Sequence, residues 1–171
     1  ARRQRQMCIR DRRWHYHPEY EIHLVNATSG TFYIGDFVGR FQPGQLIMTG
    51  PNLPQNWISD IQPDEIVPIR SLVIQFPEPF IENACATMPE MEALRPLLDR
   101  SRRGVLFDDE TTRLVRPLMD RLVEAQGIRR LALFWEILDH LAKAPQSEVL
   151  ASLGFGPVSY THLRAHETRG N

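Results

Sequence analysis

The sequence predicts a mainly β domain that continues into helices. In the first half of the chain, short apolar runs recur at regular spacing and are interrupted by glycine and proline. This pattern is typical of an antiparallel sandwich or barrel, and it does not resemble alternating βαβ units. After about residue 80 the apolar residues recur at helical spacing instead. With 42% hydrophobic and 24% charged residues among 171, the chain can bury an ordinary core.

The strands follow from these apolar runs and from the turns between them. The Gly-Asp pair at 35–36 predicts a tight hairpin. The Pro-Gly pair at 43–44 predicts another turn, and residues 50–54 interrupt the chain again. The expected strands are EIHLV, TFYI, FVGRF, LIMT, NWIS, IVPI and SLVIQF, over residues 21–25, 31–34, 37–41, 46–49, 56–59, 66–69 and 71–76.

Three helices are expected in the second half. The segment 89–101 begins with proline and acidic residues, which favour a helix start. The segment 108–127 is acidic at its start and glycine at its end, and Pro117 should kink or shorten it. The apolar positions expected to face the core of this second helix are Leu114, Leu118 and Leu122.

The last helix, over residues 128–145, is apolar on two sides. Its main stripe comprises Leu131, Phe134, Trp135, Leu138, Leu141 and Ala142. Leu133 and Ile137 lie off that stripe. We therefore expect the helical hairpin of residues 109–143 to form a homodimer, because these two residues would otherwise add exposed apolar surface. The alternative is that the helix is simply buried between its neighbour and the barrel.

The two ends of the chain differ from the middle. ARRQRQMCIRDR and VSYTHLRAHETRGN resemble translated sequencing-adapter read-through, so we expect residues 1–12 and 158–171 to pack against nothing. The alternative is a basic arm and a polar tail. The domain boundaries we expect are a β-barrel over 13–80 and a helical dimerisation segment over 81–157.

Removing these ends changes the charge balance. They hold seven of the 20 basic residues and two of the 21 acidic ones, which leaves 13 against 19, a net charge of −6. Such an acidic body is a poor surface for phosphate backbones. We expect no nucleic-acid binding by this part itself.

Little in the sequence points to export or to a membrane. No apolar run approaches the ~20 residues that span a bilayer, and no secretory signal is visible. The two cysteines, Cys8 and Cys85, have neither disulfide-framework nor metal-ligand spacing. We expect a cytoplasmic protein without membrane contact.

The segment WHYHPEYEIH, residues 14–23, carries the chemistry that most needs explanation. If it is extended, His15, His17 and Glu21 share one face, together with Glu19 and His23. Three interpretations stay open for His15, His17 and Glu21: they ligate a metal, they line an effector pocket, or they form a hydrated or internally paired strand face. His23 is expected to be structural or superficial.

Here the residues resemble a known family. The spacing His15-x-His17-x3-Glu21 is similar to the first cupin motif, with a longer gap to Gly30, and residues 39–57 are similar to the second. The whole stretch of about 13–156 resembles the N-terminal sensor and dimerisation domain of AraC-type bacterial transcription regulators. This resemblance implies a cupin-type (jelly-roll) β-barrel followed by a helical hairpin that dimerises.

The resemblance also implies partners. A small-molecule effector, with sugars as one candidate class, would bind inside the barrel. DNA would be bound by a pair of helix-turn-helix motifs in a C-terminal part that we expect to be absent from this chain. The rival interpretation is a metal-dependent cupin enzyme, such as a dioxygenase or a sugar isomerase; we expect no enzyme activity.

One departure from the cupin pattern concerns the metal. Where the second motif usually carries His, this chain has Gln55, so only His15, His17 and Glu21 remain as ligands. A neutral amide is a poor substitute for imidazole, so we expect at most a weakly held divalent metal and no other cofactor. The residues we expect to bind the effector are His15, His17, Glu21, Gln55 and Trp57.

For four residues the sequence supports weaker expectations. Trp57 can stack on a ligand or belong to the core. Arg70 is expected in a surface salt bridge, and His140 is expected to be solvated. Cys85 has no charged neighbour that would make it reactive.

Overall fold

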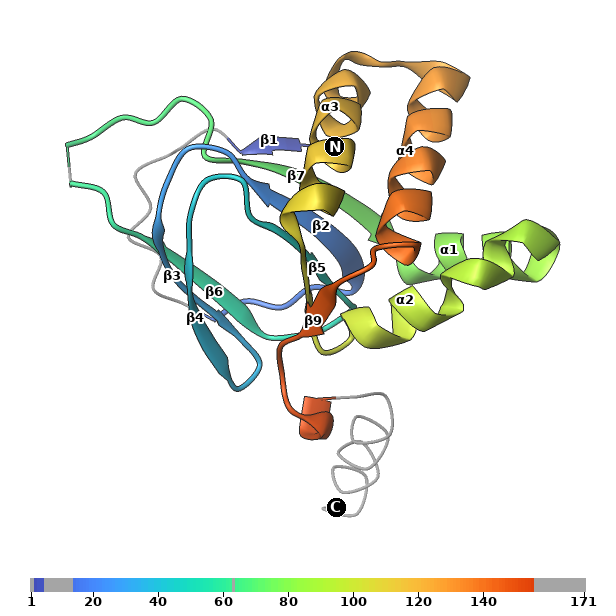
Figure 1. Cartoon of the computed structure of the whole chain (residues 1–171), viewed down its shortest axis with the longest axis horizontal. Coiled ribbons are helices and arrows are strands. Elements are labelled where there is room, and N and C mark those ends of the chain that lie inside the picture. Colours follow the sequence, from blue (N-terminus) through green and yellow to red (C-terminus); the bar gives the residue numbers. More distant parts are fainter. Residues whose placement is uncertain (1, 5–13, 63, 156–171) are drawn as a thin grey trace, which may run out of the picture.

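The computed structural model describes residues 2–4, 14–62 and 64–155, which form two antiparallel sheets and a helical layer (Figure 1). The larger sheet has the strand order β1-β7-β2-β5-β8-β9, and the smaller one has the order β4-β3-β6. The strands of the larger sheet are β1 (Arg2–Gln4), β7 (Ser71–Pro77), β2 (Glu19–Val25), β5 (Leu46–Thr49), β8 (Val105–Phe107) and β9 (Ser147–Val149). Those of the smaller sheet are β4 (Phe37–Phe41), β3 (Gly30–Ile34) and β6 (Gln55–Ser59).

The helices lie on the side of the larger sheet that faces away from β3, β4 and β6 (Figure 1). They are α1 (Glu78–Thr87), α2 (Arg95–Ser101), α3 (Asp109–Glu124) and α4 (Gly127–Ala142), with short 3-10 turns η1 (Pro89–Leu94) and η2 (Leu153–Phe155). None of the helices in the described part of the chain is long and apolar enough to cross a membrane. This mixed β/α arrangement agrees with the predicted barrel followed by a helical hairpin.

Both faces of the larger sheet carry apolar side chains. One face packs against the helices and the other against the smaller sheet. From β2, the even-numbered Tyr20, Ile22 and Leu24 pack with the helices in one core cluster. The odd-numbered Val25, with Ile47 of β5, packs with the smaller sheet in a second cluster. Because successive side chains of a strand point to opposite faces, one sheet separates two cores.

The helical hairpin forms as predicted. The Asp108 carboxylate caps α3 by accepting a hydrogen bond from the Thr111 backbone N–H at 2.7 Å. Gly127 adopts a φ of 62° at the turn into α4, a conformation that favours glycine. Pro117 lies inside α3, which nevertheless continues to Glu124. The predicted end of the helix at Gly127 is therefore close to the observed one.

The buried face of α4 differs from the predicted stripe. Leu133 and Ile137 are fully buried, whereas Leu131 is 43% exposed and Ala142 is exposed. Phe134, Leu138 and Leu141 of the predicted stripe are buried as well. The helix therefore buries a broad apolar face that includes Leu133 and Ile137 in the core with α3 and the larger sheet, as the alternative interpretation expected. The argument that Leu133 and Ile137 form a dimer surface is therefore wrong.

Other elements also differ from the sequence prediction. Residues 66–69 form no strand, because Pro68 has no N–H to donate to a sheet. An additional helix, α1, begins directly after β7. The division into a barrel over 13–80 and helices over 81–157 does not separate the strands from the helices, because β8 and β9 extend the larger sheet.

The expectation for the N-terminal end is wrong in one place. Arg2–Gln4 forms β1 and pairs antiparallel with Ser71–Val73 of β7. Residues 5–12 and 158–171, for which no packing was expected, lie outside the described residues.

The observed orientation of α4 predicts a difference between two leucines that lie two residues apart. Leu133→Ala should lower the free energy of unfolding by about 2–5 kcal/mol, since Leu133 is 2% exposed and its loss leaves a cavity. Leu131→Ala, at an exposed position of the same helix, should cost less than about 1 kcal/mol. Urea unfolding of both variants tests this. Equal losses, or a larger loss for Leu131→Ala, would contradict the orientation.

Candidate functional site

The polar side chains of the larger sheet converge between the two sheets. In the register of the sheet, Glu21 of β2 lies opposite Thr49 of β5 on one side and Gln75 of β7 on the other. All three side chains share the face turned toward β6. From β6, Gln55 and Trp57 complete the group, and Gln55 donates a long hydrogen bond of 3.4 Å to the Thr49 hydroxyl. The barrel interior is therefore polar at this end.

The centre of this group is the pair His17 and Glu21. His17 Nε2 lies 2.8 Å from Glu21 Oε2, and the Gln75 side-chain amide donates to the same oxygen at 2.9 Å. His17 Nδ1 lies 3.1 Å from the Glu19 carbonyl oxygen. Because both ring nitrogens face acceptors, the ring satisfies both contacts only as the imidazolium. Glu21 is buried and His17 partly buried, so this is an ion pair largely withdrawn from water.

The pair shifts the pKa of both partners. The hydrogen bond to Glu21 raises the pKa of His17 above 6.5, against the opposing effect of burial. For Glu21, burial opposes ionisation, but the hydrogen bond from His17, the positive charge that His23 carries when it is protonated at low pH, and the hydrogen bond from Gln75 outweigh it, so its pKa is lowered. Each partner thus stabilises the charged form of the other.

His23 is buried two residues further along β2. Its Nδ1 has no hydrogen-bond partner in the described part of the chain, and it lies 4.0 Å from Glu21 Oε1. Its ring centroid lies 4.2 Å from that of Trp57. Burial lowers the pKa of His23, so the ring is neutral near pH 7. His23 is therefore not a surface residue, and it presents an unused ring nitrogen to the interior.

The His23 side chain also lines a small cavity of about 50 Å³. Its lining combines aromatic rings with hydroxyl groups and one guanidinium: His23, Val25, Thr28, Phe41, Trp57, Ser59, Arg70 and Ser71. Trp57 stacks on Phe32 with a centroid distance of 4.9 Å, which fixes one wall. Arg70, for which a surface salt bridge was expected, thus lies at the interior site.

Gln55 is almost completely buried and takes part in this network. Its amide oxygen accepts a hydrogen bond from the Trp57 indole N–H at 3.2 Å. The side chain that was expected to replace the fourth metal ligand therefore orients the aromatic wall of the cavity.

His15 does not join the site. Its side chain is exposed, and its backbone pairs with that of Gln55 in an isolated bridge. The strand expected over residues 21–25 begins at Glu19, directly after Pro18, which cannot donate to a sheet ladder, so the extended conformation considered for the whole segment 14–23 is not continuous. The alternation predicted for the whole segment thus holds only from Glu19 onward.

The residues present do not fit a divalent metal. Within residues 14–62 and 64–155, no group of three His, Cys, Asp or Glu side chains is arranged to hold a metal ion. The Nε2 of His17 is already engaged with the carboxylate that would be its fellow ligand.

Sequence reasoning missed three members of the site. Thr49 and Gln75 come from strands far along the chain, and no local pattern marks them. His23 was assigned to a structural or surface role, although its place on the same strand face as Glu21 was a usable signal.

Comparison with known proteins adds one match. A family model described as the AraC-like ligand binding domain matches residues 3–141. Among curated proteins, none matches the chain.

The pKa shifts predict how the ion pair stabilises the protein as pH changes. Because the pKa of His17 is raised, its contribution is complete below 6.5 and is lost as pH rises through the raised value. Because the pKa of Glu21 is lowered, its contribution is complete above 4.5 and is lost as pH falls through the lowered value. The pair should contribute most between these two pH values.

Unfolding measurements on His17→Ala test this window. The difference in unfolding free energy between the natural protein and His17→Ala should shrink as pH rises from 6.5 to about 9. His15→Ala, at an exposed position, serves as the control and should show only a small difference. A His17→Ala difference that stays constant or grows over this range would contradict the ion pair.

Proposed function

The chain belongs to the AraC-like ligand-binding domain family, and on that premise we propose that it senses an effector in the interior between β2 and β6. As a member of that family, it is an effector-sensing domain of an AraC-family regulator. The observation that supports this location best is the buried, unpartnered Nδ1 of His23 beside the Trp57 ring. A buried polar atom without a partner costs free energy unless a ligand or water satisfies it.

The lining of the interior favours a small polar ligand with hydroxyl groups, such as a sugar. The His23 nitrogen and the hydroxyls of Thr28 and Ser59 can exchange hydrogen bonds with such a ligand. The indole of Trp57 offers a flat apolar face for a sugar ring. The His17–Glu21 pair lies beside this group. In it, the charge of the buried Glu21 carboxylate is already balanced by His17.

The size of the cavity implies movement on binding. At about 50 Å³ it is far smaller than the roughly 300–1,000 Å³ of typical ligand pockets. An effector can therefore enter only if lining side chains move, and the ligand then favours the opened state. Such a difference in affinity between two states is what a sensor requires.

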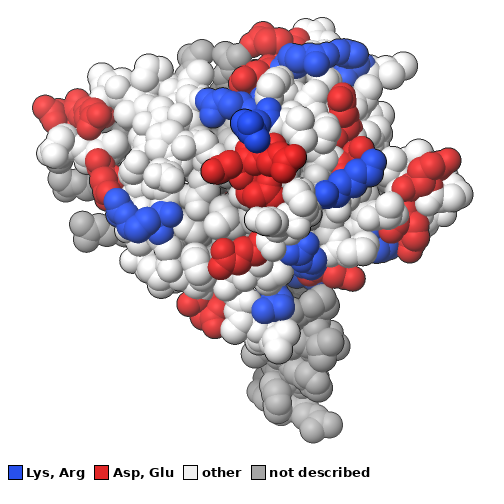
Figure 2. All heavy atoms as spheres, viewed as in Figure 1, with Lys and Arg blue, Asp and Glu red and all other residues white. Residues whose placement is uncertain are grey.

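A regulatory role is favoured over the cupin enzyme. The family match points to ligand sensing, and the interior offers no described group of metal ligands for a metal-dependent reaction. We propose that the domain acts in the cytoplasm as part of a transcription regulator whose DNA-binding part lies outside this sequence. Figure 2 supports this assignment, because basic and acidic residues are interspersed on the face in view and form no continuous basic patch.

We also propose that the hairpin of residues 109–143 forms a homodimer. Leu133 and Ile137 are buried and do not support this proposal. Its support comes from two exposed apolar residues of the hairpin: Leu114 of α3 is 51% exposed and Ile128 of α4 is 86% exposed. Large apolar side chains on one hairpin are typical of an interface between copies.

The effector proposal predicts the outcome of a thermal-shift screen with pentoses, hexoses and small organic acids. At least one polyhydroxy compound should raise the melting temperature, and His23→Ala should weaken its binding by about 1–3 kcal/mol because a buried hydrogen bond is lost. His140→Ala, on α4, is the matched control and should bind normally. Sugar binding that survives His23→Ala and Trp57→Ala unchanged would place the effector elsewhere.

The dimer proposal predicts a two-fold larger particle in sedimentation velocity at tens of micromolar protein. Leu114→Asp should shift the protein toward monomer, because it places a charge in the interface. Leu153→Asp, at an exposed position outside the hairpin, should leave the dimer intact. A monomeric natural chain, or equal effects of the two substitutions, would contradict the proposal.

A further inference from the structure

A second hollow lies outside the barrel, where β7 meets α1 and the helical hairpin. Its volume is about 320 Å³, within the range of small-molecule sites. It is lined by Ile74, Gln75, Phe76, Pro77, Phe80, Leu122, Gly127, Arg130, Leu131 and Phe134. We call it the β7 groove. It shares no lining residue with the cavity beside His23.

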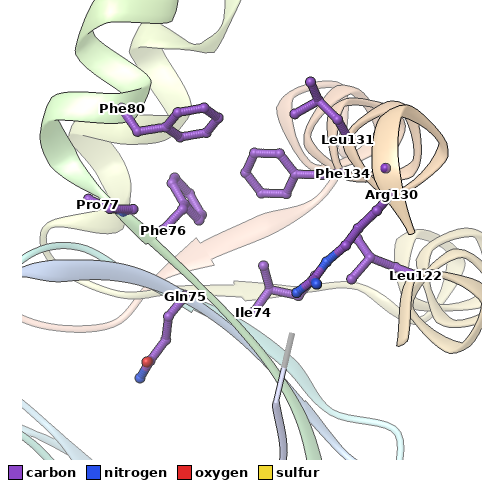
Figure 3. A pocket seen from close by; sticks show the side chains of 10 residues that line it. Ile74, Gln75, Phe76, Pro77, Phe80, Leu122, Arg130, Leu131 and Phe134 are labelled. Atoms are coloured by element: carbon purple, nitrogen blue, oxygen red, sulfur yellow. The ribbon is translucent and has the colours of Figure 1, made fainter. Parts of the chain in front are cut away.

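The walls of the groove are mainly aromatic. Phe76 and Phe134 meet edge to face with a centroid distance of 5.0 Å, and Phe80 lies 6.1 Å from Phe134. Figure 3 shows these three rings pointing toward one another from β7, α1 and α4. Phe80 and Leu131 remain 39% and 43% exposed, so the rim of the groove is accessible to a ligand.

One cation lies at this apolar hollow. Arg130 of α4 lines the groove, and its guanidinium lies beside Ile74 in Figure 3. Within residues 14–62 and 64–155, no carboxylate forms an ion pair with it. The groove contains no acidic residue. Among the described residues that line the groove, Arg130 therefore carries the only charge.

A neighbouring hollow provides the contrast. It lies at the hairpin turn and is lined by Arg121 and Arg129, but also by Asp120 and Glu124. Its charges of both signs give it no preference for an anion. Of these two hollows, the β7 groove is the one whose described lining combines an apolar body with a single cation.

We propose that the β7 groove is a second ligand site, distinct from the effector site in the barrel, for a small amphipathic carboxylate. The aryl or alkyl body lies among Phe76, Phe80 and Phe134, and the carboxylate pairs with the Arg130 guanidinium. Arginine suits this role because its planar donors match the geometry of a carboxylate.

The test compares three probes with the same body and different head groups. Calorimetry near neutral pH measures the binding of 3-phenylpropionate, 3-phenylpropan-1-ol and 3-phenylpropylamine to the full chain. The carboxylate should bind best and the amine worst. Arg130→Gln should weaken the carboxylate by about 2- to 5-fold, as for an exposed ion pair, and should leave the alcohol unchanged.

Two control variants make the result specific. Arg129 is next to Arg130 in the sequence but lines the neighbouring hollow, so Arg129→Gln should change none of the three affinities. Phe80→Leu, which keeps an apolar side chain, should weaken all three probes. Equal binding of carboxylate and alcohol, or no binding of any probe, would overturn the proposal.

Other outcomes would assign the groove differently. If Trp57→Ala abolishes carboxylate binding while Arg130→Gln and Phe80→Leu do not, the probe binds in the barrel and the proposal fails. If no probe binds and Leu131→Asp converts a dimer into monomers in sedimentation, a second copy of the chain covers the groove and the proposal also fails.

Discussion

The two faces of β2 lie in different environments, and the rest of the structure depends on this separation. On one face, the side chains of Tyr20, Ile22 and Leu24 pack against the helices. On the other, Glu21 and His23 point between the sheets. A shift of one residue in register would exchange the two sets and bury the charges in the apolar core. The register of β2 with β5 and with β7 is therefore strongly constrained. This register determines which side chains meet inside the barrel.

The charged residues of the interior are stable there because they are paired. A lone buried carboxylate would be strongly disfavoured, but Glu21 receives hydrogen bonds from both His17 and Gln75. This arrangement leaves Nδ1 of the neutral His23 without a hydrogen-bond partner among the described residues, next to an aromatic wall. The paired residues hold the site in place, and the unpaired one is the natural contact for an effector. β7 links this interior to the outer groove, since Gln75 reaches Glu21 while Ile74 and Phe76 line the groove.

The sequence could predict the parts that follow from local pattern. Alternation marked Glu21 and His23 as facing one way. The segment 108–127, with acidic residues at its start and glycine at its end, and the helical apolar spacing of 128–145 marked the hairpin. The sequence could not predict that β2 begins at Glu19, directly after Pro18, and that His15 is exposed. It placed Phe134, Leu138 and Leu141 correctly on the buried face of α4 but not Leu133 and Ile137, because a helix with apolar residues on two sides is oriented only by its neighbours. Thr49 and Gln75 depend on strand register, which joins residues far apart in the chain.

The central claim is that His17 is held as an imidazolium by Glu21 while His23 stays neutral in the same interior. Long-range ¹⁵N–¹H spectra of protein labelled in its histidine rings test it most directly, at the pH of 6.5 where an unperturbed ring is half protonated. The account predicts that both nitrogens of His17 are mainly protonated and that His23 shows the pattern of a neutral tautomer. A neutral His17, a metal-shifted His17 nitrogen, or a charged His23 would contradict it.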